Sequence, residues 1–146
     1  MSRVRRIINN YKVKKIKFFT ICSLLFLLVF GLISAVQQKT VLIPASADKL
    51  VNPIKNDEKA TLAGARIYKK LCWTCHGDKG EGNGPGASEI KTKAADYRSA
   101  QVMNRSDGAL FWWISNGGND MQPYKEVLTK DEIWKTVNYV RKLQGK

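Results

Sequence analysis

The chain has 146 residues, enough for one small domain and an accessory segment. It carries 25 Lys and Arg against 12 Asp and Glu, a formal net charge of +13. A basic excess can signal nucleic-acid binding, but seven of the positive charges lie in residues 1–17, directly before an uncharged apolar run. Membrane topology explains those charges, so no nucleic-acid partner is predicted. Three cysteines are also fewer than a disulfide scaffold normally has.

The uncharged apolar run covers residues 18–36. As a helix rising ~1.5 Å per residue it would be roughly 28 Å long, close to the ~30 Å hydrocarbon core of a bilayer. We therefore predict a single-pass transmembrane helix, with the basic residues 1–17 in the cytoplasm. The rest of the chain is then on the periplasmic or outer side of the inner membrane. Signal-peptide apolar regions are usually shorter, about 7–15 residues, so a retained anchor is favoured over a cleaved signal.

Residues 37–59 are predicted to be a linker, because they contain Pro44 and Pro53 and no sustained apolar period. A domain is expected over residues 60–146. Apolar residues at three- and four-residue steps predict a first helix running into Cys72: Leu62, Ala63, Ile67, Tyr68 and Leu71. Residues 77–86 contain five glycines and one proline, which indicates a loop.

A further helix is expected through residues 112–114. Ser106 or Asp107 is its predicted N-cap, and Gly117 ends it. A second loop follows and contains Met121.

The last helix has the clearest start signal, because Thr129 is followed three residues later by Glu132, the pattern of a capping box. Its apolar stripe consists of Ile133, Trp134, Val137, Val140 and Leu143. No β pattern competes, so the domain is predicted to be all-α. At about 85 residues it is small for a self-sufficient core, and a large apolar cofactor would supply part of its interior.

The strongest functional motif is Cys72-Trp73-Thr74-Cys75-His76. The C-x-x-C-H spacing is typical of c-type haem attachment, because two thiols three residues apart reach both vinyl groups of one porphyrin and the next imidazole reaches its iron. His76 is the only histidine. A thioredoxin-type pair would need a βαβ context, and a structural zinc site would need a fourth ligand. We predict one covalent haem c, held by Cys72, Cys75 and His76.

A methionine sulfur is the expected sixth ligand, because methionine opposite histidine raises the reduction potential and suits electron transfer. The candidates are Met103 and Met121. Met103 lies near the start of a predicted helix, whereas Met121 lies in a glycine-rich loop that ends in Pro123. Core packing is the commoner role of a methionine, but a loop between helices is a poor place for it. Met121 is therefore favoured.

Residues 61–143 resemble a class I cytochrome c in its small mono-haem form, similar to the cytochrome modules of bacterial respiratory enzymes. The residues that carry the resemblance are Gly64, Tyr68, Cys72 to His76, Gly77, Gly80, Gly82, Gly84, Pro85, Met121, Trp134 and Tyr139. The resemblance implies three to four helices around the haem, the first and last crossing at right angles with Gly64, Tyr68 and Tyr139 in contact. It also implies that the Pro85 carbonyl accepts the N–H of the His76 imidazole, which would orient the ring.

The sequence thus predicts an electron carrier of a bacterial respiratory chain, rather than an enzyme, held at the membrane by residues 18–36. Tyr97 and Arg98 are candidates for contacting the haem propionates. Lysines around the haem edge would steer an acidic redox partner; the candidates are Lys69, Lys70, Lys79 and Lys125.

Two alternatives stay open. The chain can be the haem-bearing subunit of a larger membrane oxidoreductase. A haem enzyme or sensor with an open sixth position is less favoured, because no catalytic His, Cys or carboxylate group supports it.

Overall fold

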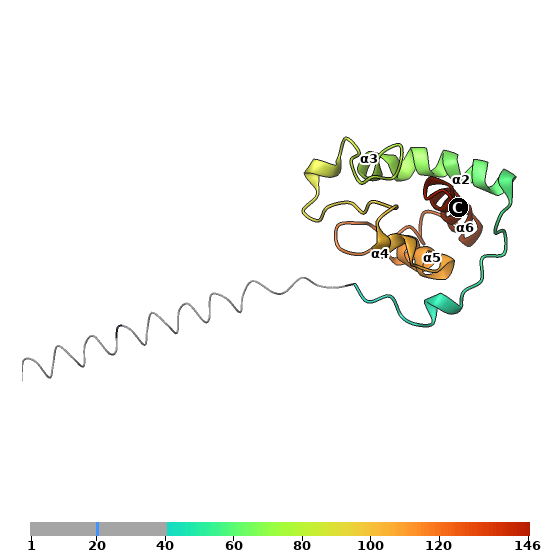
Figure 1. Ribbon diagram of the computed structural model, residues 1–146, viewed down its shortest axis with the longest axis horizontal. Helices are drawn as coiled ribbons and strands as arrows, with labels where there is room; N and C mark the ends of the chain where they lie inside the picture. Colours follow the sequence, from blue (N-terminus) through green and yellow to red (C-terminus); the bar gives the residue numbers. More distant parts are fainter. Residues whose placement is uncertain (1–19, 21–40) are drawn as a thin grey trace, which may run out of the picture. The chain divides into compact units, whose positions relative to one another are not determined.

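The computed structural model describes Thr20 and residues 41–146 (Figure 1). Apart from Thr20, the predicted transmembrane segment lies outside the described residues. In the part of the chain that is described, no helix has both the length and the apolar character needed to cross a membrane. Residues 41–146 form a compact unit.

The compact unit is helical, as predicted. Its elements in chain order are η1 (Ala47–Lys49), α2 (Glu58–Leu71), α3 (Trp73–His76), η2 (Ala87–Glu89), α4 (Ala100–Met103), α5 (Asp107–Asn116) and α6 (Lys130–Leu143). Within residues 41–146 the only β pairing is an isolated bridge between Gly118 and Met121.

The predicted helix starts are confirmed. Ser106 is the N-cap of α5, and its hydroxyl accepts from the Ala109 N–H at 3.0 Å. Thr129 and Glu132 form both bonds of the capping box at α6. Such caps satisfy backbone donors that have no partner inside the helix.

The packing of α2 on α6 is the most extensive between helices, and Figure 1 shows α2 lying across the view beside α6 seen nearly end-on. Gly64 makes this close approach possible, because a methyl group there would lie 1.9 Å from the carbonyl oxygen of Lys135. The Tyr68 and Tyr139 rings meet beside it, with centroids 5.1 Å apart. The predicted contact between Tyr68 and Tyr139 is confirmed, and Gly64 lies against the backbone of α6 at Lys135.

The hydrophobic core lies between α2, α5 and α6. Tyr68, Ile133 and Val137 are its fully buried members, and the rings of Phe111 and Trp134 stack at 4.3 Å. The predicted stripe of α6 is buried as expected, with Leu143 partly buried at its end.

Residues 41–57, which we call the strap, pack against the helices, whereas the sequence predicted a linker over 37–59. The Asn52 side chain donates to Asn138 at 2.8 Å and to Asp107 at 3.2 Å. Ala47 is buried, and its carbonyl oxygen would lie 2.0 Å from a methyl group at Gly108. The strap is held by backbone contacts, by polar side chains and by Ile54, which is partly buried against the core cluster. These contacts follow no sustained apolar period in the sequence.

Candidate haem-attachment site

The Cys-x-x-Cys-His motif folds as a single helical turn. Cys72 ends α2 and begins α3, and its carbonyl oxygen accepts from the backbone N–H groups of Cys75 at 3.2 Å and His76 at 3.0 Å. Both thiols are free. Burial, and to a lesser extent Cys75, raises the pKa of the Cys72 thiol to about 12.

The glycine loop folds back onto this turn. Gly82 N–H donates to the carbonyl of His76 at 3.0 Å, Gly84 N–H to that of Cys75 at 3.1 Å, and Gly86 N–H to that of Thr74 at 2.8 Å. A methyl group at Gly84 would lie 2.2 Å from the Thr74 carbonyl oxygen. Glycine therefore allows the loop to satisfy the last carbonyl groups of the turn and fix its backbone.

The His76 ring is oriented by the chain segment after the loop. Its Nδ1 donates to the carbonyl oxygen of Ala95 at 3.1 Å, and the ring stacks on Tyr97 with centroids 4.7 Å apart. Burial lowers the pKa of the imidazole, with the Ala95 carbonyl opposing the shift. The ring is therefore neutral near pH 7, as a metal ligand must be.

The acceptor for His76 differs from the expectation for Pro85. The bonds from Gly84 and Gly86 hold this part of the loop against the backbone of α3, and Pro85 lines a surface hollow beside Trp73. The Ala95 carbonyl occupies the expected role instead. Sequence reasoning could not find it, because a backbone acceptor leaves no trace in the side-chain pattern.

Met121 lies in a tight turn between α5 and α6. Its N–H donates to the Gly118 carbonyl at 3.0 Å, and the Gly118 N–H donates back to Met121 at 2.9 Å. Its side chain is partly buried against the core cluster that contains Cys72 and Tyr97. Met103, in α4, is not among the residues packed against that cluster.

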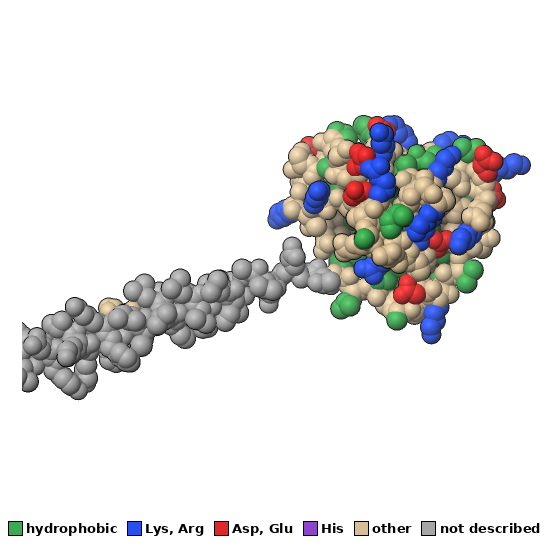
Figure 2. All heavy atoms as spheres, viewed as in Figure 1, with side chains coloured by type: hydrophobic (Ala, Val, Ile, Leu, Met, Phe, Trp, Pro, Cys, Tyr) green, Lys and Arg blue, Asp and Glu red, His purple; other side chains and the backbone are tan. Residues whose placement is uncertain are grey.

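The charged residues near the motif have partners of their own. The Arg98 guanidinium pairs with Glu81 and lies 3.9 Å from Asp96. Lys69 pairs with Asp78 at 2.9 Å and lies 4.2 Å above the Trp73 ring. On the face shown in Figure 2, basic side chains are interspersed with acidic and apolar ones rather than gathered in one patch.

These residues fit a c-type haem. Two free thiols and a neutral imidazole share one helical turn, and Met121 packs against the cluster that contains Cys72. Cys72, Cys75 and His76 would hold the porphyrin and its iron, and Met121 is the candidate for a further iron ligand.

Comparison with known proteins identifies the family of this chain. Residues 59–140 match the family described as cytochrome c oxidase, cbb3-type, subunit III. Cytochrome c-L of Methylorubrum extorquens is 34% identical over 90 residues, which are 60% of this chain and 42% of that protein. This chain therefore spans less than half the length of that relative.

Two solved structures are similar to parts of this chain. The reducing HAO-like protein complex of Kuenenia stuttgartiensis contains a chain that is 33% identical, with a TM-score of 0.57 over 62% of this chain and 46% of the other. The structure described as KustC0563 c-type cytochrome is 29% identical, with a TM-score of 0.48 over 56% of this chain and 96% of the other.

Proposed function

The chain belongs to the c-type cytochrome family of cbb3-type oxidase subunit III and carries covalently bound haem c; from this premise we propose that it transfers single electrons with His76 and Met121 as axial ligands. When bound, the haem iron supplies one-electron chemistry between its ferric and ferrous states.

One observation carries the proposal: two contacts within the protein itself fix the orientation of the His76 ring. Its Nδ1–H is bonded to Ala95 and its face is stacked on Tyr97, which leaves Nε2 as the coordinating atom. A ligand with a fixed tautomer and ring orientation suits electron transfer, because little rearrangement accompanies the change of charge. Cys72 and Cys75 would attach the porphyrin on the same turn.

We place the protein at the inner membrane of a bacterium, with the haem domain on the outer side and residues 18–36 as its anchor. The support is the apolar run and the basic residues before it. Its partners would be respiratory redox proteins, whose acidic surfaces would suit the lysines of the domain.

A second candidate is the haem-bearing subunit of a larger oxidoreductase. The similar Kuenenia chain belongs to a protein complex, which favours this reading. Purification in mild detergent separates the two, because a subunit co-elutes with its partners and a free carrier does not.

The axial ligand is tested by Met121→Ala beside the matched variant Met103→Ala. Sulfur bound to ferric haem gives a weak near-infrared absorption band. We expect Met121→Ala to abolish the band and lower the reduction potential, because the ligand that favours the ferrous state is lost. Met103→Ala should keep both. A band that survives in Met121→Ala would overturn the ligand assignment, because another sulfur would then be bound. A wild-type protein without the band would bring forward a haem enzyme or sensor with an open sixth position.

A further inference from the structure

The segment that orients His76 is itself hydrogen-bonded to two other parts of the fold. We call residues 94–97 the proximal segment. The Tyr97 N–H donates to the Gly80 carbonyl at 2.8 Å, which ties the segment to the glycine loop. The Tyr97 carbonyl accepts from Nε2 of Gln144 at 2.9 Å, which ties it to the end of α6. The backbone N–H and the carbonyl of Tyr97 are therefore both hydrogen-bonded. Tyr97 follows the Ala95 acceptor by two residues.

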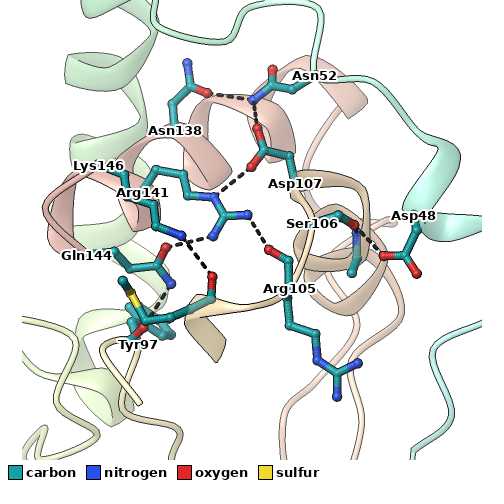
Figure 3. Close-up of polar contacts among 12 residues, drawn as sticks. Asp48, Asn52, Tyr97, Arg105, Ser106, Asp107, Asn138, Arg141, Gln144 and Lys146 are labelled. Atoms are coloured by element: carbon teal, nitrogen blue, oxygen red, sulfur yellow. Dashed lines mark hydrogen bonds and ion pairs between the residues drawn. The ribbon is translucent and has the colours of Figure 1, made fainter. Parts of the chain in front are cut away.

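Gln144 is well placed for this role, because its side chain is buried and both ends of its amide are used. Its Oε1 accepts from Arg141 Nη1 at 2.8 Å, while its Nε2 donates to Tyr97. Figure 3 shows Gln144 between these two residues. The bond from Arg141 fixes which end of the amide faces Tyr97, since a flipped amide would present an acceptor to a carbonyl.

Arg141 is in turn held rigidly. Its Nε donates to Asp107 at 2.7 Å and its Nη2 to the Arg105 carbonyl at 2.6 Å (Figure 3). The amide of Gln144 is thus supported from α5 as well as from α6.

The Tyr97 ring connects the position of the Tyr97 backbone to the orientation of His76. It is buried, and a methyl group at Gly80 would lie 2.4 Å from it. The Tyr68 ring meets it at 6.2 Å, nearly edge-on. With these neighbours the ring has one orientation, and its stacking on His76 follows from where the Tyr97 backbone is held.

We propose that Gln144 is a positioning residue for the proximal histidine: it fixes the Tyr97 carbonyl, and so holds the Ala95 acceptor and the Tyr97 ring against His76. This inference rests on the proposed electron-transfer function. Gln144 lies outside residues 59–140, the part that matches the family, so the role is not one that the family match assigns. A strong Nδ1–H bond makes the imidazole a more basic ligand, which favours the ferric state and lowers the reduction potential.

The test replaces Gln144 in the haem-loaded full chain. Gln144→Leu removes the donor at similar size, and Gln144→Glu keeps an acceptor for Arg141 while removing the donor to Tyr97. We expect the Nδ1–H of His76 in the reduced protein, followed by NMR, to exchange with solvent deuterium at least severalfold faster in both variants. We also expect the reduction potential of Gln144→Leu to rise, by up to a tenfold change in the redox equilibrium, about 59 mV for one electron.

Thr136→Val is the matched control. Thr136 is buried on the same helix, its hydroxyl donates to the Glu132 carbonyl at 2.9 Å, and it has no bond to the proximal segment. The Thr136→Val variant should be less stable, with no change in the exchange rate of the His76 Nδ1–H or in the reduction potential. Unchanged exchange and potential in Gln144→Leu would overturn the proposal, as would equal changes in Thr136→Val. If Gln144→Leu does not fold, Gln144→Glu with wild-type exchange overturns it. Failure of the proposed function looks different, because the wild-type chain would then lack a reversible redox couple.

Discussion

The carboxylate of Asp107, the first residue of α5, is shared by two partners. Arg141 donates to one oxygen at 2.7 Å and Asn52 to the other at 3.2 Å, and both charged side chains are about 15% exposed. Burial alone would raise the pKa of Asp107. The bonds from Arg141 and Asn52, with the charges of Arg141 and Lys55, outweigh it and hold the pKa below 3.8. One side chain thereby links α5, α6 and the strap.

This arrangement predicts a pH-dependent contribution to stability. A carboxylate whose pKa is depressed on folding stabilises the protein above its unfolded pKa, and the contribution is lost as pH falls through the folded value. We expect Asp107→Asn to lower the free energy of unfolding by about 1–3 kcal/mol at pH 7. The difference from wild type should shrink as the pH falls below about 4. Urea unfolding at a series of pH values measures it, and a difference that is constant down to pH 3 would contradict the charge-based explanation.

Side-chain patterns predicted some residues of the site and not others. Cys72, Cys75 and His76 have a spacing that the chemistry itself requires, so the sequence identifies them. Ala95 acts through its carbonyl, and Gln144 acts through a contact 47 residues away in the chain. Neither role depends on a local pattern, so only the fold reveals it.

Among the elements, the crossing of α2 and α6 depends on the absence of a side chain at Gly64. Alanine is normally preferred to glycine inside a helix by about 1 kcal/mol. At this position its methyl group would overlap the Lys135 carbonyl, and overpacking typically costs about 1–3 kcal/mol. The two effects have opposite signs, so the measured sign distinguishes them.

We therefore expect Gly64→Ala to lower the thermal midpoint, although it raises helix propensity. Leu62→Ala serves as the control, because Leu62 is half exposed on the same helix and should change the midpoint little. A midpoint raised by Gly64→Ala would show that α2 and α6 do not approach this closely.

The same reasoning tests the strap. A methyl group at Gly108 would lie 2.0 Å from the Ala47 carbonyl oxygen and 2.8 Å from that of Leu50. We expect Gly108→Ala to displace the strap and to speed proteolytic cleavage within residues 41–52, while α5 itself remains helical. Cleavage at the wild-type rate, together with increased stability, would mean that the strap is not packed on α5.

Helix ends were predictable wherever a side chain caps them. Ser106, Thr129 and Glu132 make the bonds that their sequence pattern indicates. The strap was not predictable, because η1 is a single short turn and the contacts that hold the strap come from a carbonyl, a small buried residue, an asparagine and Ile54. None of these has the apolar periodicity from which packing is inferred.

At the scale of the whole molecule, the arrangement combines a haem-binding unit with a basic, apolar N-terminal segment. The unit accounts for covalent attachment and for ligand orientation. The N-terminal segment is the basis of the proposed location at the membrane.

The anchor is tested by the mass of the protein purified from membranes. A retained segment predicts the full 16.5 kDa chain plus one haem. A mature N-terminus near residue 36 or 48 would show that the segment is a cleaved signal. Proteolysis of spheroplasts, in which the outer side of the inner membrane is accessible, should release the haem domain if the topology is as proposed.

If residues 18–36 anchor the chain as proposed, the packed strap would limit the distance between the haem domain and the membrane. Twenty-two residue steps separate Val36 from Glu58, a contour length of roughly 75 Å at about 3.4 Å per residue. With the strap packed, at most five of these steps, a contour length of roughly 17 Å, separate Val36 from the compact unit that begins at Val41. A haem domain connected to the membrane by so short a segment would exchange electrons only with proteins in or beside the same membrane. Release of the strap would increase this maximum contour length about fourfold.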